Sequence, residues 1–164
     1  MRSILKVYWD SKKPIYKISH SKLQEEGINF LLLDVDGTLL NRNSTKIPKA
    51  VKKWILDSKT FFSIYLISNN PSKRRIEKIA KELDLKYKYK ASKPRKKVIL
   101  QIIEELNSES KNIAIMGDRI FTDIIAGNRC NIRTILVKRV NRDGLPIKFN
   151  LTLTIEKLIS HFIK

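Results

Sequence analysis

The stretch of sequence that decides the fold is Leu31-Leu32-Leu33-Asp34-Val35-Asp36-Gly37-Thr38-Leu39-Leu40. A continuous apolar run that stops at a turn signal is typical of a strand buried on both faces, as in the centre of a parallel sheet. In such sheets, ligands bind beyond the carboxyl ends of the strands. We therefore expect Asp34 and Asp36 to stand at a ligand-binding edge, where Gly37 allows the chain to turn.

Two simpler explanations compete for the Asp-x-Asp pair. Aspartate is common in turns, so the pair alone also fits ordinary turn chemistry. A calcium-binding loop needs an acidic or amide ligand at its fifth position, glycine at its sixth and glutamate at its twelfth. Those positions hold Thr38, Leu39 and Thr45, so the pattern excludes a calcium loop of this kind.

The chain has 164 residues and one cysteine, Cys130. This length is enough for one domain with its own core. A lone cysteine forms no intramolecular disulfide, which indicates a reducing compartment and a buried apolar role for Cys130. No apolar run approaches the roughly 20 residues that cross a bilayer. Asp10, Lys12 and Lys13 follow the first apolar residues too closely for a signal peptide.

Charge is the strongest compositional signal, with 34 Lys and Arg against 16 Asp and Glu and a formal net charge of +18. Such a field favours polyanionic partners, namely nucleic acid, an anionic bilayer or a phosphorylated substrate. An AT-rich coding sequence, which yields many lysines, produces the same composition without selection for binding. Both explanations stay open at this point.

Apolar periodicity predicts an α/β fold, a doubly wound parallel sheet of about five strands with helices on both faces. The predicted strands are residues 29–34, 61–67, 87–91, 113–116 and 134–137. The first predicted helix begins at Ser21, which caps it with Gln24 in the reciprocal position, and ends at Gly27. Further helices are predicted to open at Pro48, at Ser72 and after Lys93, and to cover residues 120–126, ended by Gly127, and 155–163.

We expect a single domain over residues 1–164. In this interpretation residues 1–27 are an N-terminal extension packed on the core, residues 28–137 are the catalytic core, and residues 138–164 form a basic loop and a closing helix. The aromatic and basic residues around Trp9 also suit a membrane interface. Packing against the sheet edge is the commoner use of such a segment, so we predict that.

Four of the predicted strands end in polar residues of an unusual kind: Asp34 with Asp36, Ser68, Lys93 and Asp118. Parallel strands all point the same way, so these ends meet at one edge of the sheet. Their convergence predicts one functional site in place of four unrelated turns.

With these positions in hand, the sequence resembles the haloacid dehalogenase (HAD) superfamily of phosphohydrolases. The first motif of that superfamily matches residues 34–39, the second matches Ser68, the third matches Lys93, and the fourth matches residues 117–123. The segments Ser-Asn-Asn, Lys-Pro and Gly-Asp-Arg-Ile-Phe-Thr-Asp further resemble subclass IIIA and its YqeG-type branch, which includes the phosphatidylglycerophosphate phosphatases.

The resemblance implies a phosphatase that works through an aspartyl-phosphate. It implies that Asp34 is the nucleophile and that Asp36 acts as general acid and then general base. Ser68 and Asn69 would bind the phosphate. Lys93 would offset charge on both the phosphate and Asp34.

The resemblance also implies bound Mg²⁺, held by the Asp34 side chain, the Asp36 backbone carbonyl and Asp118, with Asp123 acting through water. Two carboxylates about 4 Å apart repel by roughly 4 kcal/mol at an effective dielectric near 20, which a dication relieves. Oxygen ligands suit Mg²⁺. For Asp123 a second explanation stays open, because an acid near a helix N-terminus is favoured by the helix dipole.

The spacing of the motifs leaves no room for a cap domain. Only 31 residues separate Asp36 from Ser68 and 24 separate Ser68 from Lys93, and a helix and a strand fill each gap. The site should therefore be open to phosphate carried on something bulky, such as a lipid headgroup, a protein or a nucleic-acid end.

The open site and the basic charge agree with phosphatidylglycerophosphate at an anionic membrane, the substrate that the resemblance implies. The alternatives are a soluble phosphomonoester, such as a sugar phosphate or a nucleotide, and a basic RNA- or ribosome-binding module with a vestigial site. No transit peptide is evident. This suits the bacterial cytoplasm or the interior of an organelle such as a plastid, with peripheral contact to a membrane.

Overall fold

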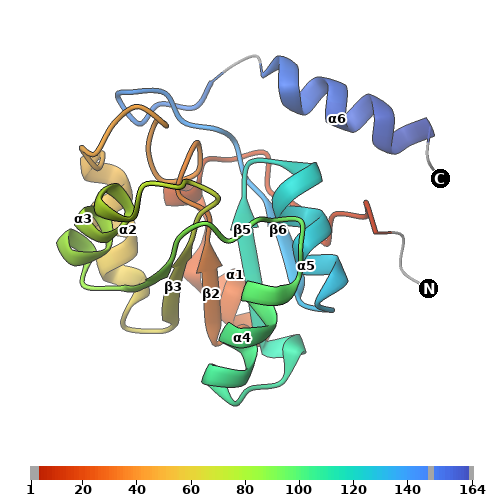
Figure 1. The fold of residues 1–164 in the computed structure, drawn as a ribbon, viewed down its shortest axis with the longest axis horizontal. Coiled ribbons are helices and arrows are strands. Elements are labelled where there is room, and N and C mark those ends of the chain that lie inside the picture. Colours follow the sequence, from red (N-terminus) through yellow and green to blue (C-terminus); the bar gives the residue numbers. More distant parts are fainter. Residues whose placement is uncertain (1–3, 148–149, 163–164) are drawn as a thin grey trace.

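The structure, a computed structural model, describes residues 4–147 and 150–162. Its centre is a six-stranded, all-parallel sheet in the order β1-β6-β5-β2-β3-β4 (Figure 1). The strands are β1 (Trp9–Asp10), β2 (Phe30–Leu33), β3 (Ser63–Ile67), β4 (Lys86–Lys88), β5 (Ile113–Gly117) and β6 (Arg133–Leu136). The apolar run before Asp34 forms β2, in the middle of the sheet.

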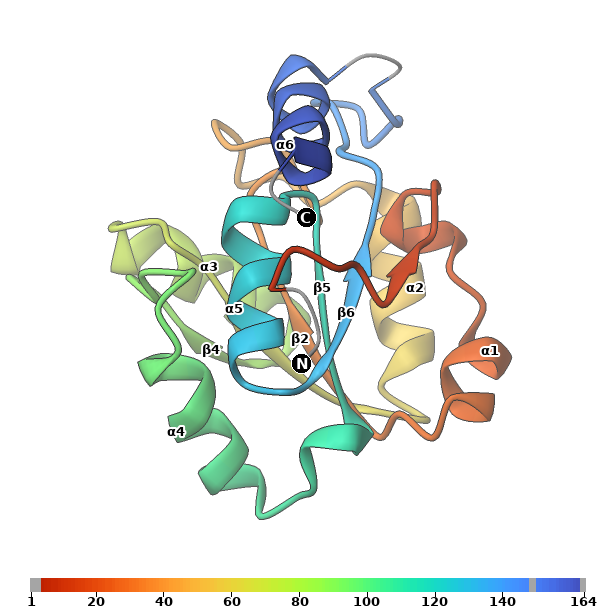
Figure 2. The ribbon, with the colours of Figure 1, turned by 90° about the vertical axis from the view of Figure 1, so that its right-hand side faces the viewer.

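Helices cover both faces of this sheet, as a doubly wound fold requires. Figure 2 shows α1 and α2 on one side of β5 and β6, with α4 and α5 on the other. The helices are α1 (His20–Glu25), α2 (Lys49–Ser58), α3 (Lys73–Leu83), α4 (Lys97–Leu106), α5 (Ile125–Arg129) and α6 (Leu151–Phe162), with short turns η1 (Ile15–Lys17), η2 (Ser110–Asn112) and the π-helical η3 (Ile120–Ile124).

The side chains of β2 alternate between two apolar cores. Leu31 and Leu33 pack with the buried residues of α2 and α3, while Leu32 packs with those of α4 and α5. All three leucines are fully buried. Alternation along a strand sends successive side chains to opposite faces, so a strand buried on both faces has to be apolar throughout.

The five predicted strands are all present, within two or three residues of the predicted ends. The sixth strand, β1, is an addition to the prediction. Trp9 and Asp10 pair with Ile135 and Leu136 of β6, so the N-terminal segment extends the sheet at its edge. Two residues are too few to give a readable alternation, which is why the sequence pattern did not reveal this strand.

Two predicted helix ends are wrong. The cap of α1 is Ser19, whose Oγ accepts from the Lys22 backbone N–H, and Ser21 lies inside the first turn. Gly127 does not end a helix, because α5 continues to Arg129. A Cβ at Gly127 would lie 2.5 Å from Cγ2 of both Ile115 and Thr134, so this glycine serves close packing of α5 on the sheet.

Other helix boundaries differ less from the prediction. α2 begins directly after Pro48, and α3 begins after its cap Ser72 as predicted. The closing helix, predicted for residues 155–163, begins four residues earlier at Leu151; residue 163 lies outside the described residues. The gaps between the motifs hold only α2, β3, α3 and β4, and the described residues contain no separate cap domain. In the same part of the chain, no helix is both long enough and apolar enough to cross a bilayer.

The packing of α5 gives a testable prediction. Replacing Gly127→Ala should lower the free energy of unfolding by about 1–3 kcal/mol, because the new methyl group overpacks the contact with Ile115 and Thr134. Urea denaturation followed by circular dichroism measures the change. Adding Thr134→Ser, which removes one of the two opposing methyl groups, should restore part of the loss. Equal stability of Gly127→Ala and the wild type would contradict the assignment.

Candidate active site

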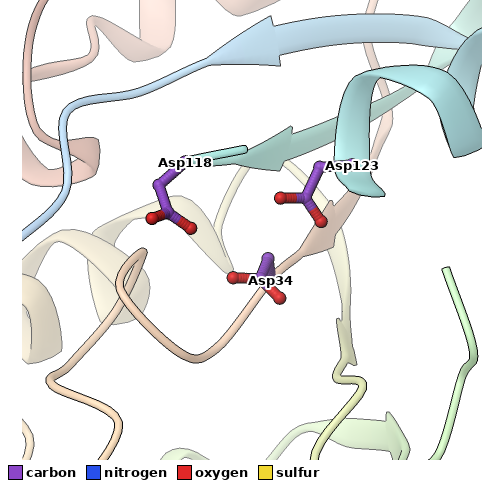
Figure 3. A group of neighbouring side chains, drawn as sticks. All are labelled: Asp34, Asp118 and Asp123. Atoms are coloured by element: carbon purple, nitrogen blue, oxygen red, sulfur yellow. The ribbon is translucent and has the colours of Figure 1, made fainter. Parts of the chain in front are cut away.

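The carboxyl ends of two neighbouring central strands place the first two carboxylates of the site. Asp34 follows β2 directly, and its backbone N–H donates to the Met116 carbonyl of β5 at 2.9 Å. Asp118 follows the last residue of β5. A third carboxylate, Asp123, comes from η3, and Figure 3 shows it together with the other two around one space.

These three carboxylates form a buried cluster with the donor set of a metal site. Asp34, Asp118 and Asp123 each offer one oxygen, and these oxygens lie within 4.8 Å of one another. The three side chains are buried, with at most 7% of each residue exposed. Neither Asp118 carboxylate oxygen accepts a hydrogen bond within the described residues. Buried carboxylate oxygens with no hydrogen bond, such as those of Asp118, are what a hard dication such as Mg²⁺ needs as ligands, so the residues present fit such an ion.

Burial also changes the protonation of two of these groups. Burial raises the pKa of Asp34 to about 6, with Lys93 acting in the opposite direction. The pKa of Asp118 is raised well above its ordinary value, first by burial and then by the charges of Asp34 and Asp123. Each raised pKa reflects the cost of holding a negative charge in a dry environment, which the nearby cations offset only in part. A bound cation would remove this cost.

Lys93 supplies the positive charge that the cluster contains. Its Nζ lies 2.7 Å from Asp34 Oδ1 and 2.6 Å from Asp123 Oδ1, and it donates to the Ile67 carbonyl at 3.0 Å. Burial acts to lower the pKa of Lys93, but the carboxylates of Asp123 and Asp34 outweigh it and raise this pKa. The ammonium is therefore charged and is held between the two acids.

Asn69 positions the backbone of Lys93. Its Nδ2 donates to the Lys93 carbonyl at 2.8 Å, and its Oδ1 accepts from the Lys93 N–H at 2.7 Å. The following Lys93–Pro94 peptide bond is cis. Ser68 Oγ accepts from the Asn70 N–H at 3.1 Å. Ser68 and Asn69 both line the pocket above the cluster, and their role as phosphate ligands stays a prediction.

Asp36 lies at the same pocket but in a different environment from the other three acids. Its Oδ1 lies 2.7 Å from Arg75 Nη2, and its Oδ2 accepts from Asn70 Nδ2 at 3.0 Å. Arg75 also donates to the carbonyls of Asn41 and Ser44. The structure thus gathers the side chains of Asp34, Asp118 and Asp123 into one cluster and pairs the side chain of Asp36 with Arg75.

Several residues of the site were missed by the sequence reasoning. Thr38 Oγ1 donates to Asp34 Oδ2 at 3.0 Å, and its place four residues after Asp34 inside the first motif could have indicated this. Arg75 and Arg139 reach the site from other elements, and no local pattern marks them. Asn70 lies in the Ser-Asn-Asn segment, but no role was predicted for it. Arg139 Nε lies 3.2 Å from Asp118 Oδ2.

The close approach of Arg139 and Asp118 also requires glycine at position 37. It has a φ of +95°, and a Cβ there would lie 2.7 Å from both Arg139 Nε and Asp118 Oδ2. A side chain at this position would enter the space that the carboxylate and the arginine occupy, in a backbone conformation that favours glycine. The turn predicted from the sequence is thus also a close approach to the cluster.

The comparisons with known proteins agree with this geometry. A family model described as HAD-hydrolase-like matches residues 90–144. "Probable phosphatase YqeG" of Bacillus subtilis is 29% identical over 140 residues, which cover 84% of this chain and 81% of that protein.

Solved structures share the fold at low sequence identity. An uncharacterized protein from Listeria monocytogenes has a TM-score of 0.57 at 17% identity, covering 77% of this chain and 86% of that one. The cobalt-bound deoxy-D-mannose-octulosonate 8-phosphate phosphatase (YrbI) of Haemophilus influenzae has a TM-score of 0.51 at 13% identity, covering 87% and 89%.

The fold, the converging strand ends and these matches define a class: the chain is a HAD-like hydrolase. Within that class it is similar to the probable phosphatase YqeG of Bacillus subtilis over most of both chains.

The buried charge of Asp118, which lies 3.2 Å from Arg139 Nε but accepts no hydrogen bond within the described residues, gives a prediction about metal-free protein. Replacing Asp118→Asn should raise the free energy of unfolding in EDTA at pH 8 by about 1–3 kcal/mol, because a buried charge without hydrogen bonds is removed. The same variant should lose the stabilisation that the wild type gains from Mg²⁺. Urea denaturation with and without millimolar Mg²⁺ measures both effects.

The pH dependence of this difference follows from the sign of the pKa shift. The folded protein holds the Asp118 proton to higher pH than the unfolded chain, so wild-type stability falls relative to the variant as pH rises above about 4. The difference should be small near pH 4 and largest at pH 8. Asp57→Asn, at an exposed carboxylate, is the matched control. An Asp118→Asn protein that responds to Mg²⁺ like the wild type would refute the ligand assignment.

Proposed function

We propose that this HAD-like phosphatase hydrolyses phosphatidylglycerophosphate to phosphatidylglycerol, with Mg²⁺ as its cofactor and Asp34 as its nucleophile. The observation that carries the proposal is the buried cluster of Asp34, Lys93, Asp118 and Asp123 beneath an open, arginine-lined pocket. Burying three carboxylates with one ammonium lowers the stability of the fold. A chain that no longer carried out a reaction would have no reason to keep such a cluster. This cost also speaks against a vestigial site on an RNA-binding module.

The surroundings of the pocket support a substrate with more than one phosphate. The pocket has a volume of about 110 Å³, room for a phosphoryl group but not for a whole nucleotide, so the rest of the substrate would stay outside. Arg42, Arg119 and Arg139 line it in addition to Lys93. Phosphatidylglycerophosphate carries a phosphodiester one glycerol away from its phosphomonoester, and arginine pairs well with phosphate.

The proposed first step is attack of the Asp34 carboxylate on phosphorus. With a pKa of about 6, Asp34 is ionised at pH 7 to 8, and Lys93 and Thr38 orient its two oxygens. The phosphorus–oxygen bond to glycerol breaks as the bond to Asp34 forms, and a proton from Asp36 goes to the departing oxygen. Lys93 offsets the charge of the phosphoryl oxygens, which Ser68 would also contact.

The second step is hydrolysis of the aspartyl-phosphate. Asp36, now a carboxylate, takes a proton from the attacking water, which releases phosphate and restores Asp34. Bound Mg²⁺ would be held by Asp34, the Asp36 carbonyl and Asp118, with Asp123 through water, and would supply charge neutralisation for the phosphoryl oxygens.

Phosphate release tests the proposed substrate. Phosphatidylglycerophosphate in vesicles should be hydrolysed much faster than an aryl phosphate, and only with Mg²⁺. Asp34→Asn should lose at least about a thousandfold of the turnover, because the nucleophile is gone, while Asp57→Asn keeps it. If only soluble esters are cleaved, the assignment as a phosphatase stands and the proposed lipid substrate is wrong. Absence of Mg²⁺-dependent turnover on every ester would favour the RNA-binding alternative.

The contact of Arg75 with Asp36 gives a separate prediction. Arg75→Met should lower kcat about 10- to 100-fold with little change in KM, because Asp36 loses the cation that positions it. The loss should be larger for an alkyl phosphate, whose leaving group needs a proton, than for p-nitrophenyl phosphate, whose leaving group does not. Arg75→Lys should restore part of kcat. Equal losses on both esters would indicate a merely structural role.

A further inference from the structure

Helix α6 has two different faces. On the inner side, Leu153 packs against the small apolar cluster of Ile120, Ile124 and Leu136. Also on that side is Glu156, which is 2% exposed and accepts from the Ile120 backbone N–H at 2.8 Å and from Arg119 Nη2 at 3.2 Å. These contacts hold α6 on η3, above the upper ends of β5 and β6 (Figures 1 and 2).

The outer side of α6 is apolar and uncovered within the described residues. Leu151 is 61% exposed, Ile155 46%, Leu158 56% and Ile159 38%. Their spacing of four, three and one residues places them on one stripe of the helix. Exposed apolar side chains are ordinary when scattered, but a contiguous stripe marks a surface that binds something.

Two partners could cover this apolar face, a second copy of the chain or a lipid bilayer, and charge favours one of them. The one glutamate of α6 points inward, and the segment that leads into the helix carries Lys138, Arg139 and Arg142. With a net charge of +18, two copies of this chain repel each other. An anionic bilayer attracts basic residues and accepts an apolar stripe that lies flat in its headgroup region.

We propose that α6 is an interfacial helix that docks the protein on an anionic phospholipid bilayer, with Leu151, Ile155, Leu158 and Ile159 inserted below the headgroups. Glu156 binds Arg119, and Arg119 lines the catalytic pocket, so α6 lies next to the mouth of the site. Docking through this helix brings the mouth to the headgroup level. This proposal and the proposed function both place the protein at a membrane. The proposal concerns binding to the bilayer and the proposed function concerns catalysis, so either one can fail while the other holds.

Vesicle co-sedimentation tests the docking. The wild type should bind vesicles of phosphatidylcholine with about one third phosphatidylglycerol, and bind pure phosphatidylcholine vesicles much less. Neither vesicle contains a phosphomonoester lipid, so binding is measured apart from catalysis. The double variant Leu151→Ser/Leu158→Ser should bind the anionic vesicles at least about tenfold more weakly, because binding scales with the apolar area inserted.

The matched control is Leu56→Ser/Leu100→Ser, which changes two exposed leucines on α2 and α4. It should bind like the wild type. Both variants should cleave a soluble aryl phosphate at the wild-type rate, which checks that each is folded. Unchanged vesicle binding by the α6 variant would overturn the proposal. So would a wild-type dimer in sedimentation velocity that only the α6 variant dissociates, since a second copy would then cover the stripe.

Discussion

A single buried ammonium, that of Lys93, ties together the parts of this site. It contacts the end of β2 through Asp34, η3 through Asp123 and the end of β3 through the Ile67 carbonyl. Each of these groups presents negative charge or a lone pair to a dry interior. Without Lys93 the two carboxylates would face each other unpaired, which costs several kcal/mol in such surroundings. The geometry of the cluster therefore depends on where the loop after β4 delivers this side chain.

A second set of charge pairs surrounds that cluster, and in each of them the cation is an arginine. Arg75 faces Asp36, Arg139 faces Asp118, and Arg119 faces Glu156. These pairs attach α3, the segment after β6 and α6 to the edge of the sheet where the site lies. Arginine suits this use, because its planar group reaches several acceptors at once.

The arginine pairs bear on the meaning of the basic composition. An AT-rich coding sequence explains many lysines on the surface, such as Lys53 and Lys111, which pair only with exposed acids. It does not explain arginines aimed at one rim from three separate elements. Because each of these arginines faces a carboxylate, the three pairs add nothing to the net charge, and the excess charge lies elsewhere. The arginines at the site and the lysines on the surface therefore have different explanations.

The sequence alone determined the α/β class, the five longer strands and the approach of Asp34, Ser68, Lys93 and Asp118. These follow from local signals: continuous apolar runs, and polar residues placed where parallel strands must end. The HAD-like class came instead from the resemblance of residues 34–39, Ser68, Lys93 and 117–123 to the motifs of that superfamily. The local signals failed at Ser21 and Gly127, where a neighbouring cap and a tight helix–sheet contact overrode the local pattern.

Only the tertiary structure decided the partners of these residues. Arg75, Arg139 and Glu156 lie far along the chain from the groups they bind, and no periodicity connects them. The edge strand β1 exists because β6 offers it a partner. Helix α6 is the clearest case: its sequence has apolar and polar faces, and the usual rule turns the apolar face inward. The structure buries Glu156 and exposes Leu151 and Leu158, because the backbone N–H of Ile120 and the guanidinium of Arg119 need that carboxylate.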